Sequence, residues 1–306
     1  MLRAVDLFAG SGGFTAGAEQ AGVSVRWAAN HWPAAVECHR RNHSETHHEC
    51  QDLHQADGSK VPATELVLAS PCCQGHAKAR GKDRPHHDAS RSTAWAVVSC
   101  CEYHRPLAFV VENVPEYLHW RLYPAWRCAM ESLGYRLTTQ VIDAADAGVP
   151  QNRERLFVVG ALKRAIEISQ PKQPHKPAST AIDFSTGKWS AVNKPGRAAA
   201  TLRRVERGRR EFGSRFVMPF YGSGSGLTGR SLDRPLGTVT TRDRWAVVDG
   251  DQMRMLTVAE YRRAMGFPDN YWLPSVRSQA IHLLGNSVPP PLARYVVGRV
   301  VEAIAA

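Results

Sequence analysis

Strand-like apolar runs alternate with helix-like amphipathic segments through the first half of the chain, and this alternation restricts the fold more than any other feature. The alternating segments lie at 4–8, 14–21, 23–29, 34–41, 65–69, 93–103 and 107–111. The apolar runs are short enough to be buried strands, and the segments between them repeat apolar residues at helical spacing. Strands joined by helices form a parallel sheet with helices on both faces. We therefore predict an α/β fold with a doubly wound, mostly parallel sheet.

The alternation of strand-like and helix-like segments ends near residue 162. A helix-like segment at 126–133 is followed by two strand-like runs, 135–141 and 156–160, which we expect to close the sheet as an antiparallel pair. The proline-rich stretch 170–177 then breaks regular structure. We predict that the first domain covers 1–163.

A small β-rich domain is predicted for residues 164–249. It contains two strand-like runs, 238–241 and 245–248, which we expect to pair with each other. It also carries five arginines between Arg203 and Arg210. Such a run is typical of a solvated helix face and equally of a surface that contacts phosphates, so the sequence leaves both interpretations open.

Residues 250–306 return to helical periodicity. Helices are predicted at 257–265 and 291–304, and we expect this segment to rejoin the first domain. No apolar run in the chain approaches the length of about 18 residues that crosses a bilayer, so we expect no membrane role.

The charge balance indicates a polyanionic partner. The 306 residues include 39 Lys and Arg against 28 Asp and Glu, which gives a net charge of +11 and a pI near 9.6. A surface of this sign attracts nucleic acid, although basic charge can also serve solubility alone. Seven cysteines and no apparent signal peptide before the first strand-like run indicate a reducing cytosol.

Reactive side chains follow three of the predicted strands. A glycine-rich turn, Gly10 to Gly13, follows the first strand, Cys72 and Cys73 follow the strand that ends at 69, and Glu112 follows the strand that ends at 111. Ligands of open parallel sheets bind beyond the carboxyl ends of the strands. Such a turn lets the backbone approach a nucleotide-like cofactor closely. A lone cysteine is more often a buried apolar residue, but this position favours a nucleophile.

These residues resemble the motifs of the cytosine-C5 DNA methyltransferase family, in the family's order and over almost the whole chain. The matching segments are Asp6-Leu7-Phe8-Ala9-Gly10-Ser11-Gly12-Gly13, Cys73-Gln74, Glu112-Asn113-Val114, Gln151-Asn152-Arg153-Glu154-Arg155, Arg234 to Thr240 and Gly285-Asn286-Ser287-Val288. The resemblance implies a class I, Rossmann-like catalytic domain and a target recognition domain. It also implies methyl transfer from S-adenosylmethionine to C5 of a cytosine that is flipped out of duplex DNA.

The resemblance assigns catalytic roles to four side chains. Cys73 attacks C6 of the cytosine as a thiolate, which turns C5 into a nucleophile. Glu112 shares a proton with N3, and Arg155 donates to O2. Arg153 steadies the site and a nearby phosphate. The basic segment 77–91 is implied to close over the extruded base.

A second group of residues is implied to hold S-adenosylmethionine. Phe8 and Trp32 would lie against the adenine and Asp52 at its amino group, while the turn of Gly10, Gly12 and Gly13 lies near the methionine part. Asn286 and Ser287 complete the pocket. His31 stands where the family has a glutamate that binds the ribose, and a neutral imidazole still offers one hydrogen bond there. For Phe8, plain core packing explains the residue equally well.

A second departure from the family pattern, and a separate cluster of possible metal ligands, also bear on these assignments. Cys72 replaces the proline that normally precedes the nucleophile, so Cys72 is the alternative to Cys73; the glutamine that follows directly favours Cys73. Histidines and cysteines also gather between Cys38 and Cys50, but without a Cys-x-x-Cys spacing. We therefore predict no metal site.

Three other functions compete with DNA methylation. A transfer RNA cytosine methyltransferase uses the same motifs, but a separate basic recognition segment favours DNA. A catalytically inert DNA-binding relative would lack Cys73, Glu112 or Arg155. A dinucleotide oxidoreductase would need a third glycine where Thr15 stands. We expect a cytoplasmic monomer of bacterial, archaeal or phage origin that binds double-stranded DNA, with a restriction endonuclease partner left open.

Overall fold

The computed structural model describes residues 1–53, 58–72, 92–220 and 229–306. The chain divides into two compact units. The first unit comprises Met1–Asp143, Glu154–Lys172 and Ser287–Ala306, and the second comprises Ala144–Arg153 and Gln173–Asn286.

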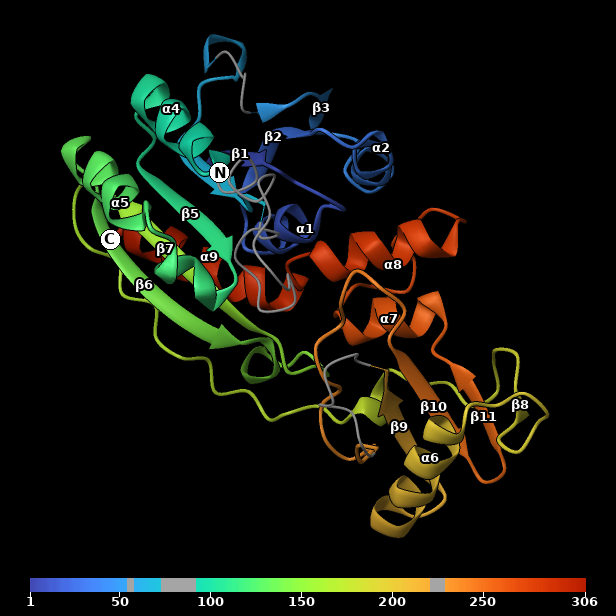
Figure 1. Cartoon of the computed structure of the whole chain (residues 1–306). Helices are drawn as coiled ribbons and strands as arrows, with labels where there is room; N and C mark the ends of the chain where they lie inside the picture. The colour runs from blue at the N-terminus through green and yellow to red at the C-terminus, as the bar shows by residue number, and fades with distance from the viewer. Residues whose placement is uncertain (54–57, 73–91, 221–228) are drawn as a thin grey trace. The chain divides into compact units, whose positions relative to one another are not determined.

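The first unit is built on a seven-stranded sheet with the order β3-β2-β1-β4-β5-β7-β6 (Figure 1). Its strands are β1 (Arg3–Leu7), β2 (Ser24–Asn30), β3 (His47–Cys50), β4 (Leu66–Ala69), β5 (Ala108–Asn113), β6 (Arg136–Asp143) and β7 (Glu154–Ala161). The first five strands in this order are parallel, and β7 runs antiparallel to both β5 and β6. The predicted mostly parallel α/β fold and its antiparallel closing pair are therefore confirmed.

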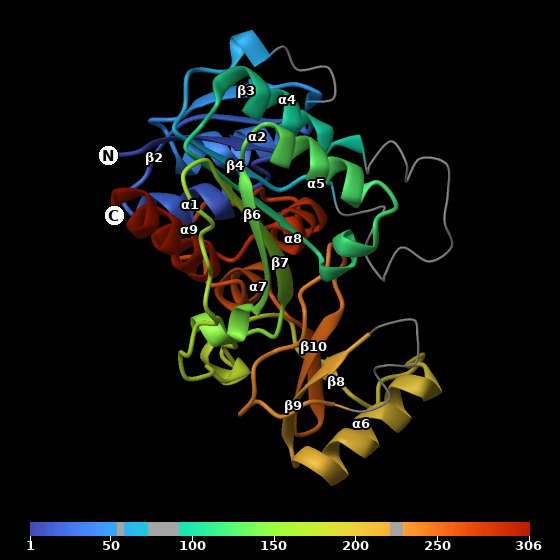
Figure 2. The same ribbon diagram turned by 90° about the vertical axis from the view of Figure 1, so that its left-hand side faces the viewer.

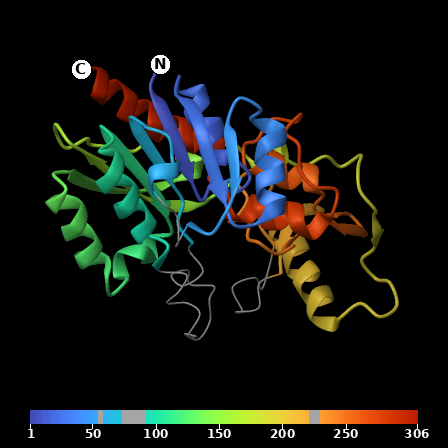
Figure 3. The same cartoon turned by 90° about the horizontal axis from the view of Figure 1, so that it is seen from above.

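Helices cover both faces of this sheet (Figure 3). Because successive side chains of a strand point to opposite faces, alternate residues of β5 such as Phe109 and Val111 reach one cluster, which also contains residues of α4 and α5. On the other face, Asp6 of β1 accepts a hydrogen bond from Thr15 of α1. The helices of this unit are α1 (Gly13–Gln20), α2 (Pro33–Asn42), α4 (Trp95–His104), α5 (Tyr123–Ser132) and α9 (Pro290–Ala305).

The second unit contains a four-stranded sheet with the order β8-β11-β10-β9, and α6 lies beside this sheet (Figure 2). All of its strand pairs are antiparallel. The elements are β8 (Ser190–Ala191), α6 (Ala199–Phe212), β9 (Arg215–Pro219), β10 (Trp245–Asp249), β11 (Gln252–Met255), α7 (Val258–Ala264) and α8 (Arg277–Asn286). The predicted small β-rich module exists, but α8 was not predicted.

The predicted strand at 238–241 is wrong. The Val239 N–H donates to the Gln151 side chain at 2.7 Å, and the Thr238 hydroxyl donates to the Asn152 carbonyl at 2.9 Å. A side chain thus satisfies a main-chain group that a strand would offer to a neighbouring strand. Strand β10 pairs instead with β9 and β11.

The compact units follow different limits from the predicted domains. Helices α7 and α8 belong to the second unit by packing, and only residues from Ser287 onward return to the first. The functional limits, with a catalytic domain at 1–163, a recognition domain at 164–249 and a returning segment at 250–306, stay a prediction. No helix in the described ranges is long and apolar enough to cross a membrane.

Candidate active site

The carboxyl ends of three neighbouring strands bring the predicted catalytic segments together. Strand β4 lies between β1 and β5, and Ala69 at its end pairs with Leu7 and with Val111. The residues that follow these positions therefore meet at one edge of the sheet. They are Phe8, Ser70 to Cys72, and Glu112. Cys73 and the segment 77–91 lie outside the described residues.

Two buried side chains hold the main chain immediately before Cys73. The Asn113 amide, at the end of β5, donates from Nδ2 to the Pro71 carbonyl at 3.0 Å, and the Asn113 side chain is 2% exposed. The Cys72 N–H donates to the Thr93 hydroxyl at 3.1 Å. The sequence analysis named Asn113 only as part of a motif and did not name Thr93, because no sequence pattern predicts a hydrogen bond between residues this far apart. Both are positioning residues for the segment that leads into Cys73.

Glu112 and Arg155 form an ion pair at this edge. The Arg155 Nε lies 3.0 Å from a Glu112 carboxylate oxygen, and both side chains are largely shielded from solvent. In the β5–β7 ladder, Glu112 pairs with Phe157, so Arg155 is its diagonal neighbour two residues away. Arg155 also donates to the Glu154 carbonyl at 2.6 Å. The antiparallel strand thus places a cation beside the carboxylate at the carboxyl end of β5.

Arg153 has surroundings unlike those of Arg155. Its side chain is 1% exposed, and its two Nη atoms donate to the carbonyls of Val239 at 2.8 Å and Gly285 at 2.7 Å. These two bonds hold the Arg153 guanidinium against the backbone at Val239 and Gly285. Its predicted role in steadying the site and a nearby phosphate stays a prediction.

The glycine-rich turn adopts the conformation that a close ligand approach requires. Gly10 and Gly12 have φ values of 57° and 91°, and Phe8 shares this left-handed region at 63°. Side chains with a Cβ are disfavoured there by roughly 1–2 kcal/mol. Gly12 is also the N-cap of α1, without a capping side chain. Gly12 thus makes no cap bond to the first turn, where the Thr15 N–H is bonded instead to the Asp6 carboxylate.

A buried carboxyl group lies beneath this turn. Asp6 is 0% exposed, and burial raises its pKa to about 7 even though the Thr15 hydroxyl donates to it at 2.7 Å. A chain of contacts continues from Thr15 to the His39 Nε2 at 3.0 Å, and from the His39 Nδ1 to the His48 Nε2 at 2.7 Å. Burial lowers the pKa of His39 well below its usual value. Two of the histidines that invited a metal interpretation thus belong to a hydrogen-bonded chain, while His43 and His47 lie against Glu19 and Glu49. Among the described residues no group of three is arranged to hold a metal.

The other predicted cofactor residues lie at the neighbouring strand ends. His31 and Trp32 follow β2, where the Trp32 N–H donates to the Asn30 side chain at 3.0 Å, and Asp52 follows β3. His31 and Asp52 are exposed, and Trp32 is half-buried. The buried Ser287 hydroxyl contacts that of Ser11 within the glycine-rich turn. Asn286 is exposed and belongs to the second compact unit.

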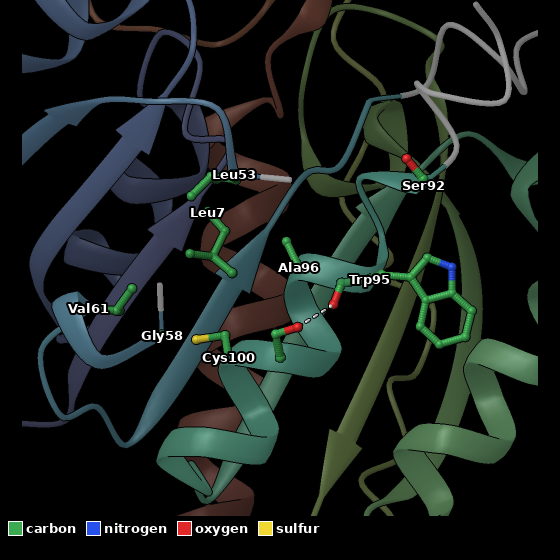
Figure 4. Close-up of a pocket in the computed structure, with 9 residues that line it drawn as sticks. Leu7, Leu53, Gly58, Val61, Ser92, Trp95, Ala96 and Cys100 are labelled. Atoms are coloured by element: carbon green, nitrogen blue, oxygen red, sulfur yellow. Dashed lines mark hydrogen bonds between the residues drawn. The ribbon is translucent and has the colours of Figure 1, made fainter. Parts of the chain in front are cut away.

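A cavity of about 250 Å³ lies between residues of α4 and the segments that carry Leu7, Leu53 and Val61 (Figure 4). Most of its wall is apolar, from Leu7, Leu53, Val61, Trp95 and Ala96, with the Cys100 thiol at one side. Two of its lining residues are chain neighbours of predicted adenine contacts: Leu7 directly precedes Phe8, and Leu53 directly follows Asp52. Apolar walls beside a few polar groups suit a flat heteroaromatic ring. Sequence reasoning missed this cavity, because its walls come from segments far apart in the chain, α4 and the residues Leu7, Leu53 and Val61.

Comparison with known proteins decides the family. The model of the C-5 cytosine-specific DNA methylases matches residues 2–199 and 231–302. This chain belongs to the C-5 cytosine-specific DNA methylase family. The resemblance drawn from the sequence motifs is thereby confirmed, and the described residues of this methylase include every motif residue discussed above except those at Cys73-Gln74.

Two type II methyltransferases are similar to this chain over almost the whole length of both proteins. The methylase is 28% identical over 322 residues to the type II methyltransferase M.NlaX of Neisseria lactamica, covering 100% of this chain and 98% of that protein. It is 24% identical to the type II methyltransferase M.HindV of Haemophilus influenzae, with 98% and 97% covered.

Solved structures support the same fold. A prophage-encoded DNA modification methyltransferase of E. coli superimposes with a TM-score of 0.74 at 18% identity, with 100% of both chains covered. The Dnmt2 methyltransferase of S. pombe gives a TM-score of 0.70 at 17% identity, again over both whole chains.

Proposed function

We propose that this methylase transfers a methyl group from S-adenosylmethionine to C5 of a cytosine in duplex DNA, with Cys73 as the nucleophile. The observation that carries the proposal is the Glu112–Arg155 pair, which lies at the carboxyl end of β5 beside the segment that leads into Cys73. One edge of the sheet thus combines a carboxyl group, a guanidinium group and the segment, Ser70 to Cys72, that directly precedes the Cys73 thiol. Family membership makes cytosine the matching substrate.

Each of the three groups meets one demand of the reaction. C5 of cytosine is a poor nucleophile until a bond forms at C6, and the Cys73 sulfur supplies that bond. Electron density then moves toward N3 and O2, where Glu112 holds a proton at N3 and Arg155 donates to O2. After C5 is methylated, loss of its proton re-forms the double bond and releases the Cys73 thiolate. The ion pair keeps Glu112 and Arg155 in fixed mutual geometry.

The residues around the glycine-rich turn fit S-adenosylmethionine. Gly10 and Gly12 give the turn its left-handed backbone, and the cavity beside Leu7 and Leu53 offers apolar walls for an adenine. Trp32, Asp52 and His31 stand at the adjoining strand ends, where the base and the ribose would lie. When bound, this cofactor supplies an electrophilic methyl group on a sulfonium. The cysteines that the structure describes are all free thiols, which suits a cytoplasmic enzyme.

Nucleoside analysis tests the proposal. Purified protein, mixed-sequence duplex DNA and S-adenosylmethionine are incubated; 5-methylcytosine is measured by mass spectrometry, and its positions are mapped by bisulfite sequencing. We expect Cys73→Ser to lower the rate by at least about 1,000-fold, because the attacking atom is lost. Cys128→Ser, at an exposed cysteine of α5, is the control and should leave the rate unchanged.

The same assay separates the alternatives. Glu112→Gln should lower the rate by about 100-fold to 10,000-fold, as expected for loss of a positioned acid. If Cys72→Ser abolishes methylation and Cys73→Ser does not, the nucleophile assignment is wrong. Modification of RNA and not of DNA would reject the substrate. Sedimentation of the protein alone at 33.8 kDa would support the expected monomer.

A further inference from the structure

Helix α6 contains five arginines, and the structure divides them into two groups. Arg204 donates to the Pro219 carbonyl at 2.9 Å and lies over the Phe220 ring, and Arg209 donates to Gly250 and Asp251 at 2.8 Å each. These two arginines bind the helix to its own sheet. The other three, Arg203, Arg207 and Arg210, are exposed. Within the described residues, no carboxylate forms an ion pair with any of these three.

The three exposed arginines form one stripe because the opposite side of the helix is packed. Val205 and Gly208 are buried, with Leu202 and Phe212 beside them against the sheet core. A Cβ at Gly208 would lie 2.3 Å from the Phe216 ring, so the helix rests closely on the sheet by this side. With 3.6 residues per turn, the stripe falls within about 60° of the helix circumference. Figure 2 shows α6 beside the strands of its unit.

The charge and spacing of the stripe fit a phosphate backbone. Five arginines against Glu206 and Glu211 give α6 a net charge of +3. From Arg203 to Arg210 the helix rises about 10 Å, which covers about three nucleotides at a rise of 3.4 Å for each nucleotide of one strand. Guanidinium groups bind phosphate oxygens in paired geometry and shed water more readily than lysine does.

We propose that the stripe of Arg203, Arg207 and Arg210 binds the sugar–phosphate backbone of duplex DNA and sets affinity, not sequence choice. This inference rests on the proposed function, since it names a surface by which the methylase holds its substrate. Phosphate contacts fix the position of a protein on DNA but carry no base information. Each one releases counterions and makes binding depend on salt.

Salt-dependent binding tests the stripe. Anisotropy titrations measure affinity for a mixed-sequence duplex of about 30 base pairs between about 0.05 and 0.4 M KCl. In the triple variant Arg203→Gln, Arg207→Gln, Arg210→Gln, the slope of log K against log salt should fall by about 2.7, which is about 0.9 for each phosphate contact. The corresponding loss of affinity at 0.1 M salt is up to about 500-fold. Glutamine keeps the helix propensity.

Two controls keep the result specific. The first control is a triple variant with the same loss of charge: Arg40→Gln, Arg41→Gln, Arg299→Gln. It removes exposed arginines that pair with glutamates of their own helices. Its slope of log K against log salt should change by less than about 0.9, the value for one phosphate contact. Changing the three stripe residues to lysine keeps the charge and should keep most of the slope. Equal slope losses in the stripe and control variants would overturn the proposal, and so would an unchanged slope in the stripe variant or equal losses with lysine and glutamine.

Methylation mapping distinguishes this proposal from the function on which it rests. The stripe variant should methylate the same sequence as the wild type, at lower efficiency, because phosphate contacts do not read bases. A changed target sequence would overturn the assignment of the stripe to the backbone. If the wild type modifies no DNA but the stripe still governs the salt slope, the enzymatic function is wrong and the surface stands. If the wild type methylates DNA and the slope is insensitive to the stripe, only the surface is wrong.

Discussion

Replacing Asn113 by alanine should slow methylation far more than it destabilises the protein. The change removes the 3.0 Å hydrogen bond from Nδ2 to the Pro71 carbonyl, two residues before Cys73, and the 2.9 Å bond that Oδ1 accepts from the Val114 N–H. Leaving a buried carbonyl without its donor costs about 1–3 kcal/mol of folding stability. A shift of about 1 Å in the segment that follows would lower kcat by about 100-fold, since reacting atoms must be aligned. The KM for DNA should stay nearly constant, because no substrate contact is removed.

A matched control separates positioning from stability. Asn42 makes the same type of bond, from Nδ2 to the Cys38 carbonyl at 2.8 Å, within α2. Asn42→Ala should lower stability to urea by a smaller amount, because Asn42 is half-buried at the end of a helix, and should leave kcat unchanged. Urea unfolding and steady-state methylation are measured for both variants at a temperature where each is folded. The reasoning is refuted if Asn113→Ala loses no more kcat than Asn42→Ala, or if its defect appears in KM.

The second anchor of this segment gives an independent check. Thr93→Val removes the acceptor of the Cys72 N–H and keeps the side-chain shape. If both anchors hold the same stretch of chain, the double variant should lose less kcat than the product of the single effects, because one displacement is counted twice. Fully multiplicative effects would show that the two bonds act on separate features.

Three further changes test the folded framework. Asp6→Asn should raise the free energy of unfolding above pH 7, by at most about 4 kcal/mol, and change it little near pH 4. Burial raises the Asp6 pKa from 3.8 to about 7, so the wild-type protein loses stability as the pH rises between these values. Equal effects of the substitution at both pH values would contradict this. Gly17→Ala should cost about 1–3 kcal/mol in thermal unfolding, since its Cβ would lie 2.4 Å from that of Ala293 on α9. Arg254→Met should cost about 3–5 kcal/mol, because it leaves the buried Glu260 carboxylate without its 2.7 Å partner; an unchanged urea midpoint would refute this.

The sequence by itself determined the elements and the sheet edge at which the chemistry lies. Apolar runs of strand length alternate with helical periodicity, and these local patterns depend on residues that are close along the chain. They located β1, β4 and β5 and the reactive residues that follow them. Because parallel strands end at a common edge, the grouping of the glycine-rich turn, Cys72 and Glu112 followed before any contact was known.

Tertiary structure alone decided which side chains of these segments meet. Arg153 and Arg155 are two residues apart in one motif, yet Arg155 reaches Glu112 through the β5–β7 ladder while Arg153 is buried against the Val239 and Gly285 carbonyls. The five arginines of α6 likewise look alike in sequence, and only packing on the sheet separates the two that bind their own chain from the three that face solvent. Such distinctions arise from contacts between residues far apart in sequence, which no local pattern encodes.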